Sequence, residues 1–153
     1  MEKRILKGLL IMGLFLVPFT IKGKYTKDWI IIFLLKGFFS SIMDTFLTRQ
    51  NKVSYPKRFL PEYFQINVLF DYLLFPITCV LFNQSTYNSN VLGIMIKALL
   101  FSVPMTVIEV VFEKNTKLIK FSNQWSWIHT LFSEMLTFMG TRLFIGLVRK
   151  YSK

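Results

Sequence analysis

The chain has 153 residues, of which 53% are hydrophobic and 17% aromatic, and its formal net charge is +11. A soluble domain of this size could not cover so much apolar surface, which favours lipid as the solvent for much of the chain. The basic residues lie between apolar runs, so they indicate contact with anionic lipid headgroups rather than with nucleic acid.

Five apolar segments predict an all-α integral membrane bundle that forms a single domain over residues 1–153. In lipid, backbone polar groups must be satisfied within each segment, which makes these segments helices rather than open strands. The segments cover residues 5–21, 28–47, 63–82, 91–112 and 128–148.

The first segment, residues 5–21, follows the basic start MEKR and has the outline of a secretory signal peptide. No A-x-A-like cleavage site follows it and more apolar segments do, so we expect an uncleaved helix. Its apolar stretch from Leu9 to Ile21 is short for a bilayer that needs about 20 residues. The sequence therefore predicts five spans, or four spans and one interfacial helix.

The loops predict how the segments are oriented. If all five span, the N-terminus, second loop (49–62) and fourth loop (113–126) share a side that holds ten Lys and Arg residues, against six on the other side. By the positive-inside rule, we expect a multi-pass protein of the cytoplasmic membrane with a cytoplasmic N-terminus. If the first segment lies on the surface, the counts are nine against seven and the orientation stays open.

Charged residues within the last four segments are the main functional signal. Each would cost about 2.5–3.5 kcal/mol at the centre of an isolated helix, so they should face the bundle interior, pair, or reach an interface. Together with Asn67, which shares a helix face with Asp71, the candidate residues of a polar interior are Lys36, Asp44, Asp71, Lys97, Glu109, Glu134 and Arg142.

The helical rise sorts these groups by depth. Measured from the third loop (83–90), Lys97 and Arg142 lie at about 9 Å, Lys36 at about 12 Å, Asp71 at about 18 Å, and the other carboxylates at about 21–27 Å. This ordering predicts an ion pair between Lys36 and Asp71, with Asn67 as an additional hydrogen-bond partner of Asp71.

Two interpretations of the remaining charges stay open. Asp44 and Glu109 lie near helix ends and could pair with loop cations such as Arg49, Lys52 or Lys114, while Lys97 and Arg142 reach the opposite surface. The sharper interpretation is a polar cavity, because polar residues recur at helical spacing in two segments. These stripes, which could equally be hydrogen-bonding seams between helices, are Lys36, Ser40 and Asp44, and Thr130, Glu134, Thr137 and Thr141.

The chain contains none of the common catalytic motifs, and we expect no enzyme activity, metal or cofactor. The single cysteine, Cys79, excludes an intrachain disulfide. His129 and Glu134 are five residues apart, whereas helical metal pairs prefer three or four.

Three stretches, at residues 55–76 (YPKRFLPEYFQINVLFDYLLFP), 99–109 (LLFSVPMTVIE) and 141–143 (TRL), carry a resemblance to a known family. The chain resembles small multi-spanning membrane proteins of spore-forming, Bacillus-type and Clostridium-type bacteria. The resemblance implies a helical fold in the cytoplasmic membrane and supplies no catalytic residues.

These patterns lead to two functional hypotheses. The leading one is a noncatalytic membrane protein that binds a protein partner or a small solute through its polar interior. The alternative is a small ion- or proton-coupled transporter or channel that uses the intramembrane carboxylates.

Overall fold

The computed structural model describes residues 1–152 and contains five α-helices, which confirms the predicted all-α bundle. The helices are α1 (Glu2–Thr20), α2 (Thr26–Arg49), α3 (Phe75–Ser85), α4 (Val91–Asn115) and α5 (Trp127–Tyr151). A π-helical turn, η1 (Phe70–Leu74), leads directly into α3. Two short strands, β1 (Val53–Ser54) and β2 (Lys120–Phe121), complete the elements.

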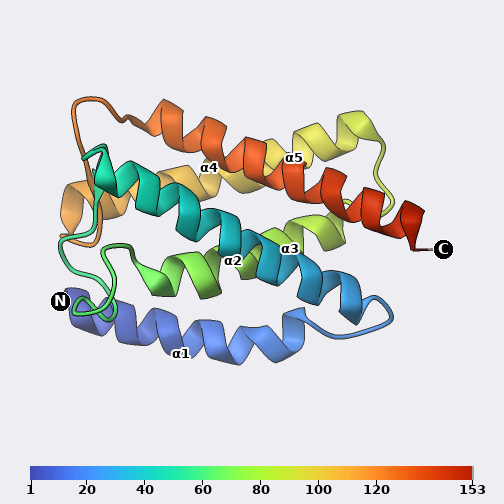
Figure 1. The fold of residues 1–153 in the computed structure, drawn as a ribbon, viewed down its shortest axis with the longest axis horizontal. Coiled ribbons are helices and arrows are strands. Elements are labelled where there is room, and N and C mark those ends of the chain that lie inside the picture. The colour runs from blue at the N-terminus through green and yellow to red at the C-terminus, as the bar shows by residue number, and fades with distance from the viewer. Residues whose placement is uncertain (153) are drawn as a thin grey trace.

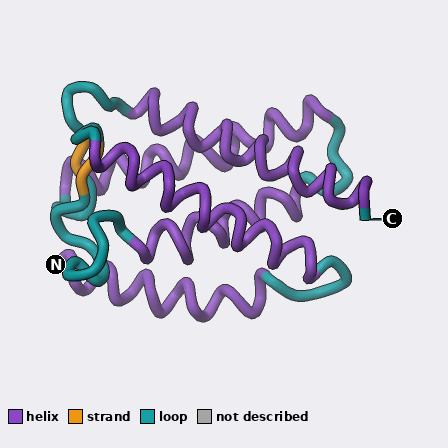
Figure 2. The backbone as a smooth tube through the Cα atoms, viewed as in Figure 1, coloured by secondary structure: helices purple, strands orange, loops and turns teal. Residues whose placement is uncertain are grey.

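The helices lie alongside one another, and consecutive helices run in opposite directions (Figure 1). The two ends of the chain therefore lie at opposite ends of the bundle (Figure 2). The short helix α3 contacts each of the other four helices, so it forms the centre of the bundle. Asp71 on η1 and Asn83 on α3 are consequently fully buried.

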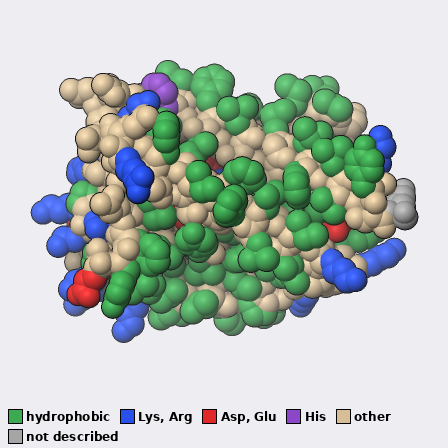
Figure 3. Space-filling view, viewed as in Figure 1, with side chains coloured by type: hydrophobic (Ala, Val, Ile, Leu, Met, Phe, Trp, Pro, Cys, Tyr) green, Lys and Arg blue, Asp and Glu red, His purple; other side chains and the backbone are tan. Residues whose placement is uncertain are grey.

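Three helices, α2, α4 and α5, are long and apolar enough to cross a membrane. Their outer faces carry many exposed large apolar side chains, and such side chains cover most of the face seen in Figure 3. Lysine and arginine side chains gather mainly toward the two ends of that face. An apolar band between charged ends is the pattern expected of a bundle surrounded by lipid.

The third apolar segment begins later than its sequence predicted. Helical structure starts at residue 68 rather than residue 63, because residues 61–66 form turns. The Arg58 guanidinium donates to the backbone carbonyls of Tyr55, Pro61 and Phe64, which holds this stretch in a compact loop. Backbone carbonyls bound by a side chain in this way do not need a helix to satisfy them.

The π turn η1 ends two residues before Pro76. The N–H of Phe75 donates to the carbonyl of Phe70, five residues earlier, instead of to the residue four earlier. Pro76 has no N–H and its ring crowds the preceding turn, so a wider turn relieves the contact that an α-helix would impose.

The second and fourth loops form a small cap at one end of the bundle. Strands β1 and β2 pair antiparallel, with Val53 opposite Phe121. The Lys117 N–H donates to the Glu2 carboxylate, so the N-terminus lies at the same end, as alternating helices require. A hydrophobic cluster joins the cap to the helices, and its buried members are Leu6, Leu47, Val53, Tyr55, Leu69, Phe70, Leu118 and Ile119.

An ion pair closes the other end of the bundle. The Arg149 side chain at the end of α5 donates to Asp28 at the start of α2 over 2.7 Å. The guanidinium also lies 4.5 Å from the ring centroid of Tyr87, whose ring stacks on Tyr25. The α2–α3–α5 arrangement is thus fixed at both ends, which defines the space between these helices.

Candidate functional site

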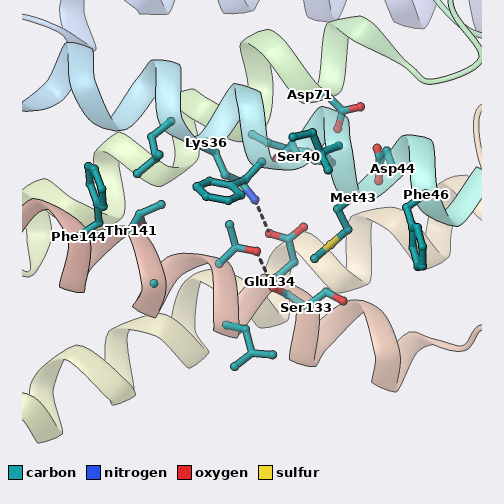
Figure 4. Close-up of a pocket in the computed structure, with 17 residues that line it drawn as sticks. Lys36, Ser40, Met43, Asp44, Phe46, Asp71, Ser133, Glu134, Thr141 and Phe144 are labelled. Carbon is teal, nitrogen blue, oxygen red and sulfur yellow. Dashed lines mark hydrogen bonds and ion pairs between the residues drawn. The ribbon is translucent and has the colours of Figure 1, made fainter.

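A cavity of about 590 Å³ lies between α2 and α5, with residues of η1 and α3 at its base. Most of its wall is apolar, and its polar lining includes Lys36, Ser40, Asp44, Asp71 and Glu134 (Figure 4). These side chains come from three segments that are far apart in the sequence. A concave apolar wall with a few convergent polar groups is the usual form of a small-molecule site.

The sequence prediction that Lys36 pairs with Asp71 is wrong. The Lys36 ammonium lies 3.8 Å from the Glu134 carboxylate, and both residues are buried. The ammonium also lies 5.6 Å from the ring centroid of Phe75 and 6.0 Å from that of Phe138. The charges of Lys36 and Glu134 therefore compensate each other between α2 and α5. The burial of the Asp71 carboxyl needs another explanation than an ion pair with Lys36.

Asp71 is fully buried, and among residues 1–152 neither of its carboxylate oxygens accepts a hydrogen bond from an N–H or hydroxyl donor; its polar neighbour is the Asp44 carboxyl, which lies within hydrogen-bonding reach. The predicted bond from the Asn67 side chain is absent as well, because neither polar atom of that amide has a partner. Asn67 acts through its backbone instead, since its carbonyl accepts the N–H groups of Phe70 and Asp71 at the start of the helix. Within residues 1–152, the interior thus contains a carboxylate that no N–H or hydroxyl donates to and an amide side chain without a hydrogen bond.

Asp44 is half-buried and accepts a hydrogen bond of 2.8 Å from the Tyr55 hydroxyl. Of the two open interpretations, the pairing of Asp44 and Glu109 with the loop cations Arg49, Lys52 or Lys114 is wrong, because among residues 1–152 neither carboxylate forms an ion pair. Burial raises the pKa of Tyr55 well above its ordinary value, and the nearby Asp44 adds to this shift. Tyr55 therefore stays protonated and can donate to Asp44.

Glu109 extends the acidic group toward the capped end. It lines a small hollow of about 40 Å³ together with Asp44, Tyr55 and Glu134. Four carboxylates thus lie around the interior, whereas Lys36 is the cation on the wall of the large cavity. In a medium of low polarity, such an excess of one sign favours protons or bound cations.

Lys97 and Arg142 do not belong to this group. The Lys97 ammonium donates to the Ser85 carbonyl and, over 2.9 Å, to the Ser89 hydroxyl. Arg142 donates to the carbonyls of Thr86 and Tyr87 over 3.4 Å each. Both side chains are half-buried and bind the end of α3 and the turn after it, where they hold the third loop against the bundle.

The polar stripe on α5 serves partly as a seam between elements. Thr130 accepts a hydrogen bond of 3.0 Å from the Trp125 indole, and the Thr141 hydroxyl lies 3.1 Å from the Cys79 sulfur. Asn83 donates to the same hydroxyl over 3.3 Å. By contrast Glu134, between these two threonines, faces the cavity. The stripe therefore combines the two interpretations that its spacing left open.

Sequence reasoning missed two features of the site. The first is Tyr55, which lies in the basic second loop. No pattern in the sequence indicates that a loop tyrosine reaches a carboxylate inside the bundle. Gly140 lines the cavity, and a Cβ at this position would meet no atom within 4 Å. Helical phase relative to Glu134 and Thr141 could have placed Gly140 near the cavity.

His129 has a structural role, because its ring nitrogen binds Ser126 at the start of α5. Among residues 1–152, no three His, Cys, Asp or Glu side chains are arranged to hold a metal ion. No family model, curated protein or solved structure matches the chain.

Proposed function

We propose that the protein is a noncatalytic, multi-pass protein of the cytoplasmic membrane that binds a small solute between α2 and α5. The observation that carries this proposal is the fully buried Asp71 on the wall of the large cavity, whose carboxylate meets a second carboxyl, Asp44, and among residues 1–152 accepts no hydrogen bond from an N–H or hydroxyl donor. Leaving a buried carboxylate without partners costs at least several kcal/mol, which a bound ligand would offset.

The membrane assignment is supported by the three apolar helices and by the alternating directions of all five. Because the connections between helices are short, each helix has to cross back through the membrane that the preceding helix crossed. The N-terminus and the basic second and fourth loops lie at one end, and we assign that end to the cytoplasm, where anionic headgroups would contact it. The resemblance to small bacterial multi-spanning proteins agrees with this location.

The dimensions of the cavity favour a small solute over a protein partner. Its volume of about 590 Å³ lies within the range of about 300–1,000 Å³ that small-molecule sites occupy. Its polar groups lie deep, with Asp71 fully buried and Lys36 only 3% exposed. A flat protein surface could not reach them.

Blocking the cavity tests this function. Gly140→Trp would place an indole in open space on the cavity wall, whereas Gly8→Trp would place the same group in open space on exposed α1. Native mass spectrometry of protein extracted directly into lipid nanodiscs should detect a bound small molecule on the wild type and on Gly8→Trp, and lose it in Gly140→Trp. If the same small molecules are bound to all three proteins, the proposal is rejected.

The row of carboxylates supports a second candidate, a proton- or ion-coupled transporter. Asp71, Asp44 and Glu109 follow one another from the centre of the bundle toward the loop cap, where Glu109 lines the small hollow. Intramembrane carboxylates at successive depths are typical of proton relays. Liposomes that contain the protein should then show a pH or ion flux that Asp71→Asn abolishes, and an unchanged flux would reject this candidate.

A further inference from the structure

We infer that the ligand of the α2–α5 cavity is a primary ammonium amphiphile, a molecule with a –NH₃⁺ group on an apolar chain, which enters from the lipid. This inference rests on the proposed function and names the ligand class of the same site. Three observations carry it: the excess of carboxylates, the unpartnered polar side chains, and the apolar wall that opens to the side of the bundle.

The charges on the cavity wall select a cation. Asp44, Asp71 and Glu134 line the cavity, and Lys36 is the single basic side chain among its lining residues. The ion pair between Lys36 and Glu134 leaves Asp44 and Asp71 as the uncompensated pair. An anionic ligand would add charge of the sign already in excess, whereas an ammonium group would reduce it.

Unpartnered polar atoms select a ligand that donates hydrogen bonds. Among residues 1–152, no N–H or hydroxyl donor reaches the Asp71 oxygens, whose polar neighbour is the Asp44 carboxyl, and the hydroxyl of Ser40, which is 7% exposed and lines the same cavity, also lacks a partner. An ammonium group has three N–H donors and no acceptor. It therefore satisfies the carboxylate directly, and the Ser40 hydroxyl can accept a second bond. A quaternary ammonium could supply the charge but none of these bonds.

The apolar wall selects a chain attached to that group. Phe39, Phe46 and Leu136 line the cavity and are also 52%, 59% and 71% exposed, so the cavity reaches the outer face of the bundle. In a membrane this outer face contacts acyl chains. A volume of about 590 Å³ exceeds the needs of a bare inorganic ion.

Matched probes of one chain length test the ligand class. The full chain in nanodiscs at neutral pH would be titrated with decylammonium, decyltrimethylammonium, decanol and decanoate. A separate titration would compare sodium chloride with choline chloride. Because a ligand of the native state raises stability with its concentration, the thermal midpoint reports binding. Decylammonium should raise the midpoint in a saturable way, with an affinity at least tenfold above those of the other three probes. Equal shifts with all four probes, or a shift caused by sodium only, would overturn the inference.

Variants separate binding in the cavity from partition into lipid. Asp71→Asn should weaken decylammonium binding at least tenfold, whereas Glu62→Gln, which removes an exposed loop carboxylate, should leave it unchanged. If Asp71→Asn fails to fold, Gly140→Trp provides the second test, because it fills the cavity and keeps every acid. Decylammonium binding that persists at full strength in Gly140→Trp or Asp71→Asn contradicts the assignment.

The result also distinguishes this inference from the proposed function. Loss of the native bound molecule in Gly140→Trp without any selectivity for decylammonium would keep the solute-binding function and reject the ammonium ligand. Absence of both effects would reject the function and the ligand class together.

Discussion

Lys36 and Glu134 form a buried ion pair, 3.8 Å apart, that joins the middle of α2 to the first half of α5. Removing one member leaves the other charge buried and uncompensated, which costs about 3–5 kcal/mol in comparable pairs. We therefore expect Lys36→Met to lower the free energy of unfolding by this order, as measured by reversible denaturation in mixed micelles. The double variant Lys36→Met with Glu134→Leu should recover a large part of the loss.

A second cycle provides the control. Lys36→Met combined with Asp71→Leu should show much weaker coupling, because Lys36 forms its ion pair with Glu134 and not with Asp71. Stronger coupling with Asp71 than with Glu134 would contradict the arrangement described above.

The Arg149–Asp28 pair predicts a separate effect at the opposite end of the bundle. Arg149→Ala removes a 2.7 Å hydrogen bond between two charged groups and the guanidinium contact with the Tyr87 ring. We expect a loss of about 1.5–3 kcal/mol, which thermal denaturation can detect. Lys150→Ala is the matched control, because among residues 1–152 its charge has no ion-pair partner. Similar losses in the two variants would show that the pair contributes nothing specific.

Tyr55 predicts a link between the loop cap and the interior. Tyr55→Phe removes the donor to Asp44 and keeps the ring in the hydrophobic cluster. The change should lower the free energy of unfolding by about 1–3 kcal/mol at neutral pH, because a half-buried carboxylate loses its partner. A variant as stable as the wild type would indicate that Asp44 finds another donor, such as water.

The same residue predicts a dependence on alkaline pH. Burial raises the pKa of Tyr55 above its ordinary value of 10.0, so above this pH the unfolded chain loses a proton that the folded chain retains. The unfolded state is then favoured, and stability falls as the pH rises. The wild type should lose stability between pH 10 and 11 more steeply than Tyr55→Phe. Parallel pH profiles of the two proteins would contradict this prediction.

The orientation of the bundle can be measured by cysteine labelling. Asn88 in the third loop and Asn123 in the fourth loop are both exposed, and Cys79 is fully buried. In a Cys79→Ser background, Asn88→Cys should react with an impermeant maleimide in intact cells, whereas Asn123→Cys should react only after lysis. The reverse pattern would place the loop cap outside the cell.

The sequence was sufficient to predict the helices, because lipid makes apolar length a direct signal of helical structure. It was insufficient for the loop cap, since strands β1 and β2 have two residues each and pair across more than sixty residues of sequence. The late start of the third segment was missed for a related reason. Its cause is the Arg58 side chain, whose hydrogen bonds to carbonyls three and six residues away leave no periodic pattern in the sequence.

The wrong partner of Lys36 has a geometric cause. A depth calculated from the rise per residue places groups along the membrane normal, but it gives no information on which neighbouring helix a side chain faces. By depth, Asp71 lies about 6 Å from Lys36 and Glu134 about 9 Å or more away, yet Lys36 faces α5. The residues of the polar interior could thus be selected from the sequence, whereas their pairing required the packing of the helices.

Because of the π turn at Phe70–Leu74, the direction of the Asp71 side chain depends on the number of residues between Asp71 and Pro76. A π turn holds one residue more than the α-helical turn that it replaces, and one residue of an α-helix corresponds to a rotation of about 100°. A related chain with one residue fewer between the positions of Asp71 and Pro76 would turn its aspartate toward a different helix, even with every cavity side chain retained. When related sequences are compared, the five-residue spacing from Asp71 to Pro76 is therefore as informative as the aspartate itself.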